Sequence, residues 1–171
     1  MAIHFSQLFW GLLLVILDFS INGFDLLVDG VGYLIVAAGC RGLSPLSMKF
    51  ATARTLCFVL AVAWLLGFAV HGELAVAYGL VTMIVNCAMI WQLLGGIGEF
   101  AMLRQRQDLA DRAGNRRVAY VAIMVGTSLL AFAMQGSRNA DPLAIILVIG
   151  MLILIVMILH LIHRVRVELA T

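Results

Sequence analysis

The chain is poor in charge: only 12% of its 171 residues are Asp, Glu, Lys or Arg, whereas 64% are hydrophobic, and its mean hydropathy is +1.10. An average soluble domain has about twice this share of charged residues, because a soluble fold must cover its exterior with polar groups. The shortage excludes a soluble enzyme, a nucleic-acid-binding domain and a disordered tail. We therefore expect the chain to fold in lipid, as a single all-α helical bundle.

Cysteine is scarce as well, and its three positions, Cys40, Cys57 and Cys87, follow no pattern. They lack the C-x-x-C spacing of metal and redox sites, and their odd number argues against a disulfide framework. We interpret them as small apolar side chains within the bundle. The common hydrolase, nucleotide-binding and metalloprotease motifs are also missing. The sequence thus indicates no catalytic residue, no cofactor and no metal site, and it favours a protein that is not an enzyme.

Long apolar runs are what the sequence has instead. A helix needs about 20 mainly apolar residues to cross a bilayer. Four runs meet this requirement, and charged or turn-forming residues bound each of them. These runs are Ala51 to Val70, Leu74 to Leu94, Val118 to Met134 and Leu143 to Leu161.

The first 43 residues are less regular. Phe5 to Phe19 and Val31 to Cys40 are apolar but short, and Asn22-Gly23 between them is a strong turn signal. They form either two short, tilted spans or a re-entrant hairpin that enters and leaves on one side. Including residues 26–28 in the second helix makes it long enough to cross, which favours two spans. The prediction is one domain over residues 1–171 with about six transmembrane helices.

Basic residues are expected to set the orientation. All but Arg138 of the 11 Lys and Arg residues fall on one face of this six-helix arrangement, and this face should be cytoplasmic. Both termini are then cytoplasmic, and the expected location is the bacterial cytoplasmic (inner) membrane. Membrane lipids are expected partners, nucleic acid is not, and partner membrane subunits or a homo-oligomer are further candidates.

Residues 104–117 are predicted to form a basic cytoplasmic connection between residues 50–103, which hold the third and fourth helices, and residues 118–164, which hold the last two. The fourth helix is expected to continue past the membrane surface, where Arg104 and Asp108, and then Asp108 and Arg112, are spaced to pair. Gly114 is a candidate stop for this helix and Asn115 a candidate N-cap for the next.

The segment from Ile21 to Ile35 holds the most informative polar residues. Ionisable groups within a span are costly and usually functional. If the second helix starts near Phe24, Asp25 and Asp29 lie four residues apart on one face. They would then bind a cation, relay protons or hold an amine of a substrate. The simpler interpretation is that Asp25 caps the helix, and that Asp29 lies at the membrane interface or pairs with another helix. Gly30 and Gly32 permit close helix contact, and Tyr33 supplies a hydroxyl inside the bundle.

Polar residues of the fourth helix complete the candidate site. Gln92 and Glu99 are seven residues apart and share a face. Glu99 is expected to form an interfacial ion pair with Arg104, or else to line a cytoplasmic vestibule. Asn86 lies deeper and is expected to form a hydrogen bond with another helix.

Residues 18–33 read DFSINGFDLLVDGVGY. This segment resembles the N-terminal stretch of small polytopic bacterial membrane proteins, D-F-x-I-N-G-F-D-[LI]-L-P-D-x-[IV]-G-Y. Val28 departs from the pattern, which has Pro at this position. The resemblance covers about a tenth of the chain; it implies that the N-terminal hairpin is a structural unit, and it implies no activity.

Two functions from different classes follow from these features. The absence of catalytic motifs and the short loops favour a small accessory or assembly subunit that binds partner helices or lipid. The acidic residues beside a broken hairpin favour an oligomeric transporter or channel that uses Asp25 and Asp29 for a cation or a proton. An enzyme acting on lipid has almost no support among the residues.

Overall fold

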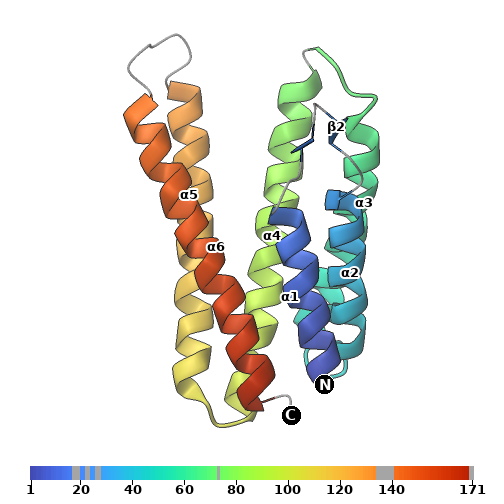
Figure 1. The fold of residues 1–171 in the computed structure, drawn as a ribbon, viewed down its shortest axis with the longest axis vertical. Helices are drawn as coiled ribbons and strands as arrows, with labels where there is room; N and C mark the ends of the chain where they lie inside the picture. The colour runs from blue at the N-terminus through green and yellow to red at the C-terminus, as the bar shows by residue number, and fades with distance from the viewer. Residues whose placement is uncertain (17–19, 22–23, 26–27, 73, 134–140, 170–171) are drawn as a thin grey trace.

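The computed structural model describes the chain except residues 17–19, 22–23, 26–27, 73, 134–140 and 170–171, and of residues 16, 20, 21, 24, 25, 28, 131–133 and 141–144 it describes only the backbone. Within this described part the fold is helical, as predicted (Figure 1). The helices are α1 (Ala2–Ile16), α2 (Val28–Leu43), α3 (Met48–Gly67), α4 (Leu74–Leu103), α5 (Gln107–Ala133) and α6 (Asp141–Leu169).

Three helices in the described residues are long and apolar enough to cross a bilayer: α3, α4 and the Ile145–Leu169 part of α6. They correspond to three of the four long runs in the sequence. The helices α1 and α2 have 15 and 16 residues, which is less than the roughly 20 that a straight crossing needs. The fourth run lies in α5, whose first half also carries charged residues.

A short β-hairpin precedes α2. The sequence did not predict these two strands. The strands β1 (Ser20–Ile21) and β2 (Phe24–Asp25) pair antiparallel, with Ile21 opposite Phe24. They flank Asn22-Gly23, so the chain reverses where this turn signal indicated. The helix α2 begins at Val28 rather than near Phe24. Val28 therefore occupies the first helical position, where proline is well tolerated.

The connection between α4 and α5 is shorter than predicted. The helix α4 ends at Leu103 and α5 begins at Gln107, and between them Gln105 has a left-handed backbone with φ of 57°. Most of the predicted basic connection is thus the first half of α5, and neither Gly114 nor Asn115 ends or caps a helix. Asp108 forms an ion pair with Arg106 (Nε to Oδ1, 2.9 Å), because the chain turns between Arg104 and Asp108.

Small residues bring the N-terminal helices close together, as predicted for Gly30 and Gly32. A Cβ at Gly32 would lie 2.6 Å from Cγ2 of Val15 and 2.9 Å from the carbonyl oxygen of Gly11. A Cβ at Gly30 would lie 2.7 Å from the ring of Trp64 in α3. Neither position has room for a side chain, and α2 is therefore held tightly between α1 and α3.

The helices follow one another around the bundle, and α6 returns to contact α1. Cys40 and Cys57 are buried, as expected, and Cys87 is half-buried; all three are free. Figure 1 shows both chain termini and the α4–α5 turn at one end of the molecule. At the other end, the α5–α6 pair diverges from the remaining helices.

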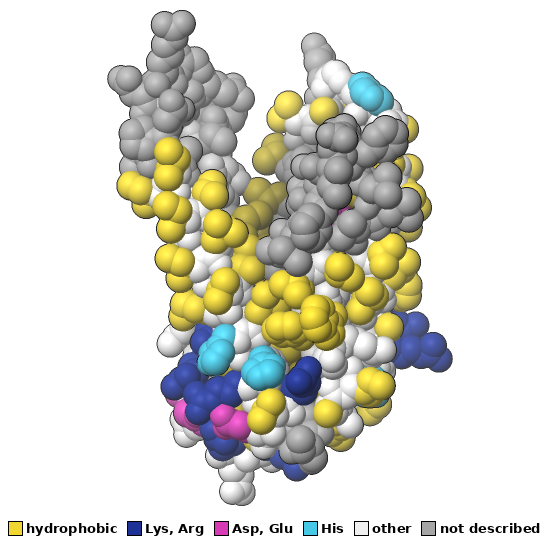
Figure 2. Space-filling view, viewed as in Figure 1, with side chains coloured by type: hydrophobic (Ala, Val, Ile, Leu, Met, Phe, Trp, Pro, Cys, Tyr) yellow, Lys and Arg dark blue, Asp and Glu magenta, His cyan; other side chains and the backbone are white. Residues whose placement is uncertain are grey.

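Charged side chains gather at the end that holds the termini. In Figure 2 the Lys and Arg side chains of this face lie there, while hydrophobic side chains cover the described surface above them. Arg106 at the α4–α5 turn contacts Glu168 near the end of α6 (Nη2 to Oε2, 2.5 Å), and Arg164 pairs with the same carboxylate. The charge asymmetry of the sequence is thus an asymmetry between the two ends of the bundle.

Candidate functional site

A hydrogen bond between two helices lies at the centre of the predicted site. The amide nitrogen Nδ2 of Asn86 in α4 donates to the hydroxyl of Tyr33 in α2 at 3.3 Å. Tyr33 is only 7% exposed. The structure confirms two predictions here: Tyr33 supplies a hydroxyl inside the bundle, and Asn86 bonds to another helix. Such a bond has few competitors in lipid, where no water replaces it.

Asp29 and Tyr33 share a pocket of about 390 Å³ on one side of this hydrogen bond. Asp29 lies in the first turn of α2, one helical turn before Tyr33, so both side chains point the same way. The hydroxyl of Thr82 is buried there and has no hydrogen-bond partner among the described residues. We call this the Asp29 pocket; it is lined by Asp29, Tyr33, Leu60, Trp64, Gly67, Phe68, Tyr78 and Thr82.

Asp25 does not join Asp29 on a helical face. Its backbone belongs to β2, before α2 begins, and its side chain lies outside the described residues. The expected pair of carboxylates four residues apart on one helix is therefore wrong, because the helix starts later than the sequence suggested. Asp25 also precedes the first turn of α2, so it is not the cap of this helix.

A mostly apolar groove lies on the other side of the hydrogen bond. It has a volume of about 270 Å³ and is formed by α1, α4, α5 and α6. Its polar groups are Asn86 and Tyr120, and neither Oδ1 of Asn86 nor the hydroxyl of Tyr120 forms a hydrogen bond within the described part of the chain. We call this the methionine groove; it is lined by Leu12, Val15, Asn86, Met89, Ile90, Tyr120, Met124, Met151, Leu152, Ile155, Ile158 and Leu159.

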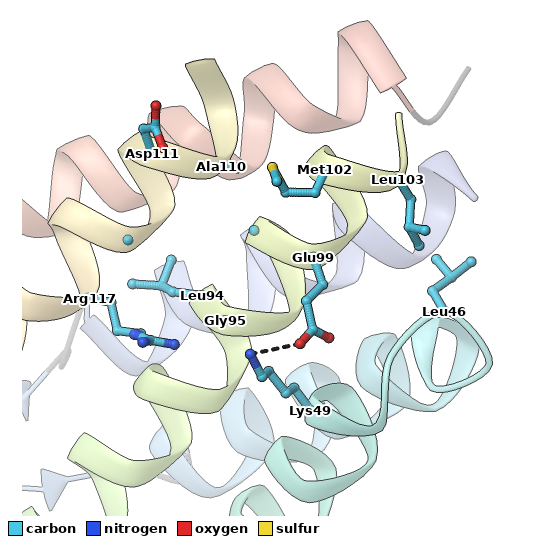
Figure 3. Close-up of a pocket in the computed structure, with 12 residues that line it drawn as sticks. Leu46, Lys49, Leu94, Gly95, Glu99, Met102, Leu103, Ala110, Asp111 and Arg117 are labelled. Atoms are coloured by element: carbon cyan, nitrogen blue, oxygen red, sulfur yellow. Dashed lines mark ion pairs between the residues drawn. The ribbon is translucent and has the colours of Figure 1, made fainter. Parts of the chain in front are cut away.

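Glu99 lies near the charged end, in a separate pocket of about 620 Å³ (Figure 3). Its carboxylate forms an ion pair with Nζ of Lys49 at 2.8 Å and accepts a hydrogen bond from the hydroxyl of Ser47. Ser47 is also the N-cap of α3, since its Oγ accepts from the backbone nitrogen of Lys49 at 3.1 Å. The predicted ion pair of Glu99 exists, but its partner is Lys49 and not Arg104. Arg104 lies over the ring of Phe100 instead.

Glu99 also lines this pocket, which agrees with the alternative expectation that it borders a vestibule. We call it the Lys49 pocket; it is lined by Leu46, Lys49, Leu94, Gly95, Gly98, Glu99, Met102, Leu103, Ala110, Asp111, Gly114 and Arg117. Gln92 is half-buried on α4 and lines none of these three pockets. The structure thus separates the candidate residues into two places, with Asp29 and Tyr33 in one and Glu99 in the other.

The helix α5 contributes a basic side chain to the Lys49 pocket that the sequence did not predict there. The guanidinium of Arg117 lies 3.7 Å from the ring centroid of Trp91 and reaches the Lys49 pocket. Arg116 is 8% exposed, and burial, with a smaller contribution from the nearby Arg112, lowers its pKa. From the sequence alone, the pair Arg116-Arg117 indicates only the orientation in the membrane, because a basic run beside a span ordinarily faces headgroups.

The exposed charges at the α4–α5 turn behave as ordinary surface pairs. The side chain of Arg106 holds the pKa of Asp108 below its usual value through a hydrogen bond. Such an exposed pair contributes little to stability.

Neither a family model nor a curated protein nor a solved structure matches this chain.

Proposed function

We propose that this chain is a six-pass protein of the bacterial cytoplasmic membrane that acts as an accessory or assembly subunit, with both termini in the cytoplasm. The concentration of Lys and Arg at the end that holds the termini supports the orientation. In this arrangement α1 and α2 cross as two short, tilted spans, and the β1–β2 hairpin faces the opposite side. α5 crosses through its apolar second half.

The methionine groove is the observation that carries this proposal. It lies where the α5–α6 pair diverges from the rest of the bundle, and Figure 2 shows this face hollowed between the two parts. Three methionines, Met89, Met124 and Met151, line it. Methionine side chains adapt to irregular apolar partners, and the free hydrogen-bonding atoms of Asn86 and Tyr120 suit a polar side chain on an incoming helix. The proposed occupant is a transmembrane helix of a partner subunit.

Site-directed photo-crosslinking in native membranes tests this proposal. A photo-reactive amino acid at Met124 or Met151 faces the groove, whereas one at Val62 or Leu65 on the exposed face of α3 contacts lipid. The groove positions are expected to yield one discrete protein adduct and the α3 positions none. Adducts at the α3 positions with none at the groove positions would contradict the proposal.

A second function is supported by the Asp29 pocket. A carboxylate, two tyrosines and the unbonded hydroxyl of Thr82 surround a space of about 390 Å³ within the helical bundle. Ionisable side chains at such positions commonly belong to ion or proton pathways. In this alternative, the protein is an oligomeric cation- or proton-coupled transporter or channel that uses Asp29, with Asp25 before it in the chain.

Flux measurements in liposomes separate the alternative from the main proposal. If the alternative holds, changing both Asp25→Asn and Asp29→Asn abolishes cation- or proton-dependent flux and leaves the fold intact. Flux that is absent in the unaltered protein, or unchanged in the double variant, contradicts a transport role. Asp108→Asn, which makes the same change at an exposed carboxylate outside the Asp29 pocket, is the control.

A further inference from the structure

Two cationic side chains converge over one glycine in the Lys49 pocket. Lys49 extends from the start of α3 and Arg117 from α5, and both reach Gly95 of α4 from opposite sides (Figure 3). A Cβ at Gly95 would lie 3.0 Å from Nη1 of Arg117 and 3.5 Å from Nζ of Lys49. The glycine therefore allows two positive charges to approach the same point.

The carboxylates of this pocket do not neutralise both cations. Glu99 pairs with Lys49, but no carboxylate of the described residues forms an ion pair with Arg117, and its Nε is buried without a hydrogen-bond partner. Asp111 also lines the pocket, yet in Figure 3 its carboxylate points away from both cations. A buried donor without an acceptor is costly, and the pocket therefore favours an anion.

The remaining wall of the pocket is apolar. Leu46, Leu94, Met102 and Leu103 line it beside the charged groups, and the volume of about 620 Å³ exceeds what a small inorganic anion fills. The pocket lies at the basic end of the bundle, where anionic headgroups gather. A ligand that joins a phosphate to an acyl chain matches both parts of the wall.

We propose that the Lys49 pocket binds an anionic phospholipid. Arg117 and Lys49 donate hydrogen bonds to the phosphate oxygens, since a guanidinium and an ammonium are strong phosphate donors. The acyl region lies along the leucine and methionine side chains. This site is independent of the methionine groove, and it holds whether or not a partner helix occupies that groove.

Lipid titration followed by native mass spectrometry of the full chain tests the proposal. Phosphatidylglycerol and phosphatidylcholine with the same acyl chains are added in parallel, and the number of retained lipids is counted. The unaltered protein is expected to retain one phosphatidylglycerol in preference to phosphatidylcholine. Equal retention of the two lipids would overturn the proposal.

Matched variants assign the retained lipid to this pocket. Arg117→Gln and Lys49→Gln are each expected to weaken the preference about five- to tenfold. Arg112→Gln removes the same charge from α5 outside the pocket and is expected to change it less than about twofold. Gly95→Ala inserts a methyl group between the cations without altering charge, and it should weaken the preference for phosphatidylglycerol. Gly79→Ala, whose added methyl group meets nothing within 4 Å, should leave this preference unchanged.

A soluble competitor distinguishes the source of the phosphate. Inorganic phosphate and glycerol 3-phosphate at millimolar concentration are expected to leave the retained phosphatidylglycerol in place, because neither contacts the apolar wall. Full displacement by inorganic phosphate would show a site for free phosphate and overturn the lipid assignment. Equal preference in Arg117→Gln, Lys49→Gln and Arg112→Gln would place the lipid elsewhere and also overturn it.

Discussion

Tyr33 and Asn86 join α2 to α4 deep in the bundle through the hydrogen bond at 3.3 Å. Both residues were identified from the sequence, since polar side chains within apolar runs usually find a partner. The sequence did not show that they would bond to each other. Their contact depends on how α2 and α4 are placed, and no local pattern encodes that placement.

Removing this hydrogen bond should lower stability modestly. Tyr33→Phe leaves the packing of the ring in place but removes the acceptor for Asn86, and it is expected to cost about 1 kcal/mol of unfolding free energy. Unfolding of the detergent-solubilised protein by sodium dodecyl sulfate measures this cost. In a double-mutant cycle with Asn86→Leu, the two costs should be less than additive. Full additivity would show that the two side chains are not coupled.

Gln105 has a conformation that is unusual for a residue with a side chain. Its φ of 57° lies in the left-handed region, where a residue other than glycine loses about 1 kcal/mol. Gln105→Gly is therefore expected to raise the unfolding free energy by up to about this amount. Gln107→Gly, the same substitution at the first residue of α5, should lower it or leave it unchanged. A loss of stability in Gln105→Gly would contradict the assigned turn.

The boundaries of the helices account for most differences between prediction and structure. The apolar runs of α3, α4 and α6 were predictable because a long run of this kind has few alternatives to a helix in lipid. The start of α2 and the α4–α5 turn could not be predicted from the sequence. At both places polar residues support either a helix or a turn, and tertiary contacts decide between them. The shift at α2 separated Asp25 from Asp29, and the shift at α5 gave Asp108 a different partner.

The close contact of α1 and α2 depends on glycine. Gly32→Val places a branched side chain where even a Cβ lies 2.6 Å from Val15 and 2.9 Å from the backbone of Gly11. This overpacking is expected to lower the unfolding free energy by about 2–3 kcal/mol, or to separate α1 from α2. Gly126→Val in α5 and Gly150→Val in α6 meet nothing within 4 Å and serve as controls. Thermal unfolding in detergent should distinguish the two groups, and equal melting temperatures would contradict the packing.

The arrangement of the spans can be tested with single cysteines. In a variant whose three native cysteines are replaced by alanine, Asn22→Cys and Gly72→Cys are expected to react with an impermeant maleimide added outside the cell. Gln105→Cys should react only after the membrane is opened. An unreactive Asn22→Cys beside a reactive Gly72→Cys would show a re-entrant hairpin and reduce the six proposed spans to four. Labelling of Gln105→Cys from outside would show that the orientation is opposite to the proposed one.

The bundle has three different regions along its long axis. Its charged end holds the termini and the Lys49 pocket, its middle holds the hydrogen bond of Tyr33 and Asn86, and its other end diverges into two parts. The helical class follows from the composition, and the charge asymmetry follows from the positions of Lys and Arg between the apolar runs. The groove and the two pockets do not follow from either, because each is built by side chains from three or more helices, whose packing no local pattern encodes.

The mass of the intact assembly, extracted gently from its native membrane, tests the accessory role most directly. The proposed function predicts stoichiometric foreign subunits bound to this chain, and these should be lost when Met124 and Met151, which line the groove, are both replaced by tryptophan. A monomer or homo-oligomer that carries only lipid or a small ligand would contradict the role.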